Sequence, residues 1–125
     1  MLLNGVELEY DFYDADQMEV FENAVERAMA DVDKALEAKK QSQLIRGVCQ
    51  VTIDMIDEIF GDGTADEVFQ GETNFRKSMQ VFNALVKEKI RQEEEVSKVV
   101  EEMKDITGKN NVPNNRQIRR ANKKN

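Results

Sequence analysis

Residues 43–60 read QLIRGVCQVTIDMIDEIF and are much more apolar than the segments around them. A helix whose apolar residues extend beyond one stripe is typically contacted by neighbours on more than one side. We therefore predict a helix here, capped by Ser42, at the centre of a helical core. The apolar residues of this segment are Leu44, Ile45, Val48, Cys49, Val51, Ile53, Met55, Ile56, Ile59 and Phe60.

The preceding segment predicts an amphipathic helix over residues 15–40. Its apolar residues recur at spacings of three and four, and Asp14 and Asp16 are candidate N-caps. Lys39 and Lys40 suit the C-terminal end of a helix, because cations there interact favourably with the helix dipole. The pattern indicates one apolar face along this helix.

The first twelve residues predict a β-hairpin with a very short first strand. Asn4 and Gly5 are the pair most typical of a type I′ turn. From Val6 to Phe12, apolar residues alternate with acidic ones, as in a strand with one covered face. Because an isolated hairpin is only marginally stable, we expect this one to pack on the helices.

Turn residues follow the apolar segment. Gly61 is a candidate C-terminal cap in the left-handed backbone conformation. Thr64 with Glu67 matches a capping box for a short helix that ends near Phe69. The sequence therefore predicts a short helix that connects two long ones.

A third long helix is predicted to begin after Thr73 or Asn74. Residues 91–95 contain no apolar side chain, so the sequence allows either one continuous helix with a solvated middle or a break near Gln92. Gly108, the pair Asn110 and Asn111, and Pro113 are predicted to end regular structure. The apolar rhythm on the two sides of the polar stretch consists of Phe75, Met79, Phe82, Val86 and Ile90, then Val96, Val99, Val100, Met103 and Ile106.

Charge divides the chain into an acidic body and a basic tail. The formal net charge of the 125 residues is −7, but residues 1–104 hold 12 Lys and Arg against 24 Asp and Glu, whereas residues 105–125 hold 6 against 1. We predict one hairpin-plus-helical domain over residues 1–106 and a disordered tail over residues 107–125. The expected fold class is mainly α, a helical bundle with an N-terminal β-hairpin. The cations singled out in the tail are Arg116, Arg119, Arg120, Lys123 and Lys124.

The composition disfavours catalysis. The chain has no His and only one Cys, so the usual neutral-pH acid/base, a His-ligated metal, a disulfide and a Cys cluster for zinc are absent. Residues 62–67 lack the ligand spacing of a calcium loop, and capping explains them better. Asp54, Asp57 and Glu58 are interpreted as a solvated helix face, and Cys49 as a buried apolar residue. We predict no enzyme, cofactor or metal site.

The basic tail leaves three alternatives open. It could be a disordered arm that solubilises the protein or contacts its own chain, a segment that docks on an acidic protein surface, or a nucleic-acid contact. Nucleic acid is the least favoured, because the tail has no aromatic residue and the whole chain is acidic. No run of eighteen apolar residues and no signal-peptide pattern is present, so we expect no membrane association and a cytoplasmic location.

Three stretches resemble a family of small proteins from phages and prophages of Gram-positive bacteria. They are LLNGVELEYDFYDADQMEVFENAVE (residues 2–26), IDEIFGDGTADEVFQGETN (residues 56–74) and NRQIRRANKK (residues 115–124). Members of this family are similar to tail assembly chaperones of long-tailed phages, which are mostly helical and associate with the tape measure protein. The resemblance implies a non-enzymatic chaperone in the host bacterial cytoplasm, whose partner is the tape measure protein or another tail protein.

The partner surface expected from this reasoning is an apolar face formed by the first and third long helices. Its predicted contacts are Phe21, Val25, Phe82 and Val86, although for each residue taken alone, packing in the core is the favoured interpretation. One alternative is a structural virion component that acts by self-association, and homo-oligomerisation suits both functions. A weaker alternative is a nucleic-acid-binding regulator that acts through the basic tail.

Overall fold

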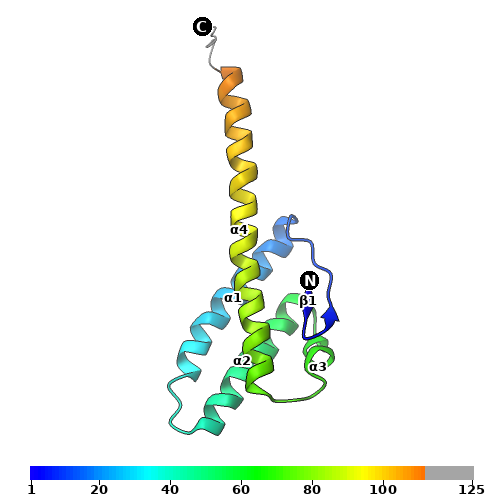
Figure 1. Cartoon of the computed structure of the whole chain (residues 1–125), viewed down its shortest axis with the longest axis vertical. Coiled ribbons are helices and arrows are strands. Elements are labelled where there is room, and N and C mark those ends of the chain that lie inside the picture. Colours follow the sequence, from blue (N-terminus) through cyan, green and yellow to red (C-terminus); the bar gives the residue numbers. More distant parts are fainter. Residues whose placement is uncertain (112–125) are drawn as a thin grey trace. The chain divides into compact units, whose positions relative to one another are not determined.

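The computed structural model describes the backbone of residues 1–111 and the side chains of residues 1–108 (Figure 1). It confirms the predicted class, a mainly helical chain with an N-terminal hairpin. The residues form two units, Met1–Lys89 and Ile90–Asn125, and the boundary between the units lies within the last helix. The elements are β1 (Leu2–Leu3), β2 (Val6–Glu7), α1 (Ala15–Ala35), α2 (Gln41–Phe60), α3 (Thr64–Phe69) and α4 (Phe75–Asn111).

The hairpin pairs β1 and β2 in antiparallel register, with Leu2 opposite Glu7 and Leu3 opposite Val6. Asn4 and Gly5 have φ values of 49° and 81°, as the predicted type I′ turn requires. The second strand, Val6–Glu7, is shorter than the alternating stretch from Val6 to Phe12. The last backbone bond runs from the Leu8 N–H to the Met1 carbonyl, 2.8 Å away.

The N-terminal ammonium group closes the open end of this hairpin. It lies 2.8 Å from Glu7 Oε2 and donates a second hydrogen bond to the Leu8 carbonyl. Beyond the ladder the predicted alternation persists, since Leu8, Tyr10 and Phe12 pack against the core while the acidic residues between them are exposed. The first residue of the chain is therefore part of the hairpin.

Helices α1 and α2 lie side by side and are joined by a short loop (Figure 1). Asp14 caps α1, since its Oδ2 accepts the Gln17 N–H at 3.0 Å. Helix α1 ends at Ala35 and not at Lys40 as predicted. A Cβ atom added at Gly47 of α2 would lie only 3.1 Å from the Ala35 Cβ, so the two helices approach closely at this point.

Helix α2 begins at Gln41, one residue before its predicted cap. Lys40 holds the N-cap position and makes no side-chain capping bond, while Ser42 lies inside the helix. The Ser42 prediction is therefore wrong. Sequence alone did not show where the loop after Ala35 would end, and this loop decides which residue precedes the first turn.

The predicted capping box at the start of α3 is also wrong. Gly63, with φ 91°, holds the N-cap position, so Thr64 is the first helical residue. Asp57 of α2 caps α3 instead, since its Oδ1 accepts the Ala65 N–H at 2.9 Å. The side-chain amide of Asn4 donates to the Val68 carbonyl at 2.7 Å and ties the hairpin turn to α3.

Helix α4 is continuous over its 37 residues. Its start is as predicted, because Asn74 Oδ1 accepts the Lys77 N–H at 3.0 Å. It does not break near Gln92, and Arg, Gln and Glu in this stretch are good helix formers. It also passes through Gly108, so the predicted boundary between residues 106 and 107 lies inside a helix. A glycine costs a helix interior only about 1 kcal/mol, too little to end it.

The core lies in the unit Met1–Lys89 and draws on the hairpin and all four helices. Among its largest fully buried side chains is Thr52, whose hydroxyl donates to the Val48 carbonyl at 2.9 Å, so this polar atom is satisfied. The other large, fully buried side chains are Phe21, Leu3, Met55, Ile56, Leu85, Val25 and Val68.

Candidate partner-binding surface

The C-terminal half of α4 carries a row of apolar side chains that the rest of the described chain leaves uncovered. Their exposed fractions range from 39% for Val99 and Val100 to 60% for Ile106. All of them belong to the unit Ile90–Asn125. We call this row the α4 stripe, and it consists of Val96, Val99, Val100, Met103 and Ile106.

The spacing of the α4 stripe is that of a helix–helix seam. Val96, Val99, Met103 and Ile106 follow one another at intervals of three, four and three, which are the a and d positions of two heptads. Val100 widens the row on one side. An α-helix of 3.6 residues per turn places this set on one side, where it can pack against a second helix.

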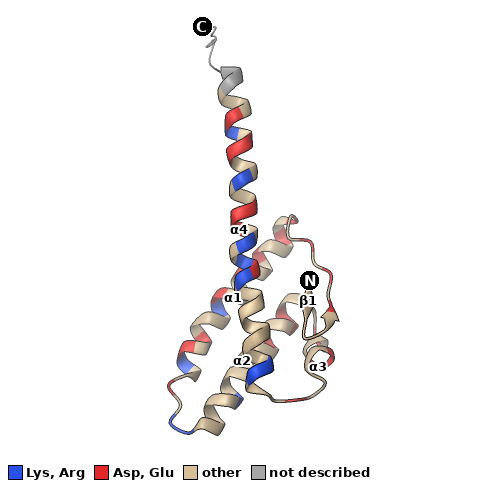
Figure 2. Cartoon of the chain, viewed as in Figure 1, with Lys and Arg blue, Asp and Glu red and all other residues tan. Residues whose placement is uncertain are grey.

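One edge of the stripe is acidic. Glu95 and Glu102 are seven residues apart and hold the g positions beside the seam. Among the side chains that the structure describes, neither of them has an ion-pair partner. The opposite edge, at the e positions, holds Glu93, Val100 and Thr107. Figure 2 shows that acidic and basic residues are both distributed along this part of α4.

The other side of the same helix segment is polar apart from one residue. Ile90, Glu94, Ser97 and Lys98 line a shallow depression there. Ile90 is 50% exposed but lies apart from the seam positions. This side offers controls for any test of the stripe.

The predicted partner contacts do not form an open face. Phe21 and Val25 are 0% exposed in the core of the unit Met1–Lys89, and Phe82 and Val86 are partly buried against the same core. A docked helix could not reach Phe21 or Val25 unless the bundle opened. The structure therefore gives Phe21 and Val25 a packing role in the core, and the partner contacts of Phe82 and Val86 stay a prediction.

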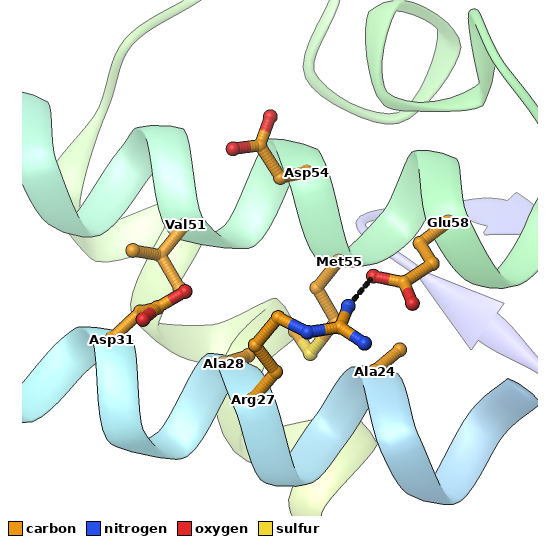
Figure 3. A pocket seen from close by; sticks show the side chains of 8 residues that line it. All are labelled: Ala24, Arg27, Ala28, Asp31, Val51, Asp54, Met55 and Glu58. Atoms are coloured by element: carbon orange, nitrogen blue, oxygen red, sulfur yellow. Dashed lines mark hydrogen bonds and ion pairs between the residues drawn. The ribbon is translucent and has the colours of Figure 1, made fainter.

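A small cavity lies between α1 and α2, with a volume of about 30 Å³ (Figure 3). Arg27 reaches across from α1 and donates to Glu58 of α2 at one end of it. This hydrogen bond raises the pKa of the Arg27 guanidinium. Asp54 points away from α1 and accepts from Gln50 at 2.8 Å. The cavity has room for a water molecule or two, so it suits helix packing and not a metabolite.

A second depression, of about 210 Å³, lies between the hairpin and the first half of α4. Leu3 and Val81 form its buried floor, and Leu2 is 63% exposed at its rim. The side chain of Asn4 is held by its bond to Val68. Its lining holds no ionisable group that could fix a charged ligand.

The remaining candidates have structural roles. Asp57 caps α3, and Cys49 is buried with 1% exposure. No group of three or more His, Cys, Asp or Glu side chains that could hold a metal ion occurs in the described part of the chain. Within the described residues, no helix combines the length and apolarity needed to cross a membrane. The five cations of the basic tail lie outside the described residues.

Comparison with known proteins gives a family for this chain. A family model matches residues 4–123, which is nearly the whole sequence. The chain belongs to DUF6673, a family of unknown function. No curated protein and no solved structure matches it. Membership of DUF6673 therefore assigns no activity to the chain.

Sequence reasoning on this DUF6673 protein found the rhythm of the α4 stripe but did not assign a function to it. Val96, Val99 and Met103 repeat like the core residues of the other helices, and an amphipathic pattern does not tell whether the chain covers its own apolar face. The polar stretch at residues 91–95 interrupts the apolar rhythm of this helix, and it is the sequence feature that could have separated the α4 stripe from the core residues.

Proposed function

We propose that this DUF6673 protein is a non-enzymatic chaperone of phage tail assembly that binds helical segments of the tape measure protein in the cytoplasm of the host bacterium. The α4 stripe is the observation that carries the proposal. It is a continuous apolar seam on a regular helix, and the described chain supplies no element that covers it.

Helix-on-helix packing is the binding mode that such a seam supports. An amphipathic helix laid along α4 would bury side chains spaced as Val96, Val99 and Met103 are. Each side chain that becomes fully buried contributes on the order of 1 kcal/mol. The flexible thioether of Met103 adapts to varied partner surfaces, which suits a protein that meets many segments of one long helical partner.

The choice of partner class comes from the sequence. Its three matching stretches resemble relatives of tail assembly chaperones, and a tape measure protein exposes helical apolar seams before the tail tube encloses it. A protein that covers such seams must itself stay dispersed, and the net charge of −7 favours this.

Co-expression with the tape measure protein encoded nearby tests the proposal. Affinity capture of the DUF6673 protein is expected to retain the tape measure protein in the soluble fraction. The double variant Val99→Glu/Met103→Glu is expected to lose this capture, because two charges would enter the seam.

A matched control places the same charges on the other side of the helix. Ile90→Glu/Ser97→Glu adds two carboxylates at exposed positions that are seven residues apart. This variant is expected to retain capture of the tape measure protein. Far-UV circular dichroism checks that both variants keep their helices. Capture by the Val99→Glu/Met103→Glu variant at the wild-type level would reject the α4 stripe as the contact.

Self-association is the second candidate, and the heptad spacing of Val96, Val99, Met103 and Ile106 favours it. In that case the protein would be a structural component of the tail. It would then form defined oligomers without a partner and be retained in purified phage particles, whereas a chaperone would be absent from them.

A further inference from the structure

The edge of the α4 stripe limits which helices can occupy it. Glu95 is half-buried and Glu102 is exposed, and both stand beside the apolar seam with no ion-pair partner among the described side chains. Residues at such edge positions face the flanking residues of a docked helix and set partner choice. Two carboxylates at such positions would favour a docked helix with cations along this edge over one with carboxylates.

We infer that the occupant of the α4 stripe is an amphipathic helix of another protein that carries Lys or Arg along the edge facing Glu95 and Glu102. The inference rests on the proposed function and specifies the chemistry of the partner. Cations at matching positions would form two ion pairs across the interface, whereas carboxylates there would repel.

Within residues 90–108, a second copy of this chain carries no Lys or Arg at the e and g positions beside the seam. In a parallel pair of α4 helices, Glu95 would face Val100 of the other copy and Glu102 would face Thr107, because a g position meets the e position five residues on. In an antiparallel pair the g positions face each other, so Glu95 facing Glu102 would repel, and a register that set Glu95 against Lys109 would leave Glu102 facing Glu102. Neither arrangement pairs both carboxylates with a cation of the described helix.

Two synthetic helical peptides of about three heptads test the inference with the full-length protein. They share one apolar seam at a and d, and carry either Lys or Glu at every e and g position. Fluorescence anisotropy at low ionic strength is expected to show about tenfold tighter binding of the Lys-edged peptide, the size given by two surface ion pairs exchanged for two repulsions. The preference should shrink toward none in about 1 M salt, where the Debye length is about 3 Å.

Charge reversal locates the effect. Glu95→Lys/Glu102→Lys is expected to reverse the preference, so that the Glu-edged peptide binds more tightly. The control Glu94→Lys/Glu101→Lys changes the net charge equally, with the same spacing, on the side of the helix away from the seam. It is expected to keep the preference for the Lys-edged peptide.

Several results would overturn the inference. They are equal binding of the two peptides to the wild-type protein, no binding of either, or a preference that Glu95→Lys/Glu102→Lys leaves unchanged. An equal loss of preference in the Glu94→Lys/Glu101→Lys control would also overturn it, because the attraction would then belong to the whole acidic surface. A local preference for the Lys-edged peptide without capture of the tape measure protein would sustain the inference and reject the proposed partner.

Discussion

Tyr10 links the segment after the hairpin to the helical core. Its ring centroid lies 5.1 Å from that of Phe12 and 5.5 Å from that of Phe60, and its hydroxyl donates to the Gln17 carbonyl. Burial raises the pKa of Tyr10 above its ordinary value, and the charge of Asp14 adds to this. The fold therefore favours the protonated hydroxyl.

This shift makes the stability of the unit sensitive to alkaline pH. Because the folded pKa is raised, the stabilisation is fully present below the unfolded value of about 10 and is lost as the pH rises through the folded pKa. We expect the urea midpoint of the wild type to fall more steeply above about pH 10 than that of Tyr10→Phe, which has no group to ionise there. Parallel pH profiles for the two proteins would contradict this.

Val25 and Val20 are identical side chains on α1 that differ in their exposure to solvent. Val25 is 0% exposed and Val20 is 41% exposed. Val25→Asp would place a carboxylate in the core, and we expect it to lower the free energy of unfolding by roughly 3 kcal/mol or more. Val20→Asp is expected to change it by only about 0.5 kcal/mol. Urea unfolding followed by circular dichroism measures both, and similar losses would show that Val25 is not the core residue described above.

At the scale of the elements, the sequence predicted capping interactions within a few residues better than the positions where helices end. Asp14 and Asn74 were each among two candidate caps that the sequence offered, because each lies three residues before the backbone N–H that it bonds. The end of α1 at Ala35 was not predicted, because the loop that follows joins two helices in close contact near Gly47. The cap of α3 was missed for a similar reason, since Asp57 comes from a different helix.

The close approach of α1 and α2 predicts an effect of side-chain size at Gly47. A Cβ atom there would already be 3.1 Å from the Ala35 Cβ, so a larger side chain has to push the helices apart. We expect Gly47→Leu to lower the free energy of unfolding by about 1–3 kcal/mol. The neighbouring control Arg46→Leu, at an exposed position, is expected to change it by about 0.5 kcal/mol. A Gly47→Leu protein as stable as the wild type in urea would show that the helices can separate without cost.

At the scale of the whole molecule, the core and the candidate binding surface fall in different units. Every buried apolar residue of the described chain lies between Leu3 and Leu85, whereas the α4 stripe begins at Val96. From the sequence, both sets have the same helical rhythm, and only three-dimensional packing shows which one is covered. This is why the fold class was predictable from the sequence and the exposed apolar face of α4 was not.

Because the core and the α4 stripe lie in different parts of the chain, removing the stripe is expected to leave the core intact. A chain of residues 1–95 retains the whole core and lacks the α4 stripe. We expect it to unfold cooperatively in urea, because the buried side chains are all present, but to lose capture of the tape measure protein. Efficient capture by the truncated chain would place the binding surface within residues 1–95.

The ammonium group of Met1 has a practical consequence for these experiments. A tag fused to the N-terminus would convert it to an amide, which abolishes its charge next to Glu7 and leaves one N–H where there were three. The extra residues would also emerge beside Leu8, at the open end of the hairpin. An affinity handle inserted between Lys39 and Lys40, both exposed in the loop that joins α1 to α2, would leave the hairpin and the α4 stripe untouched.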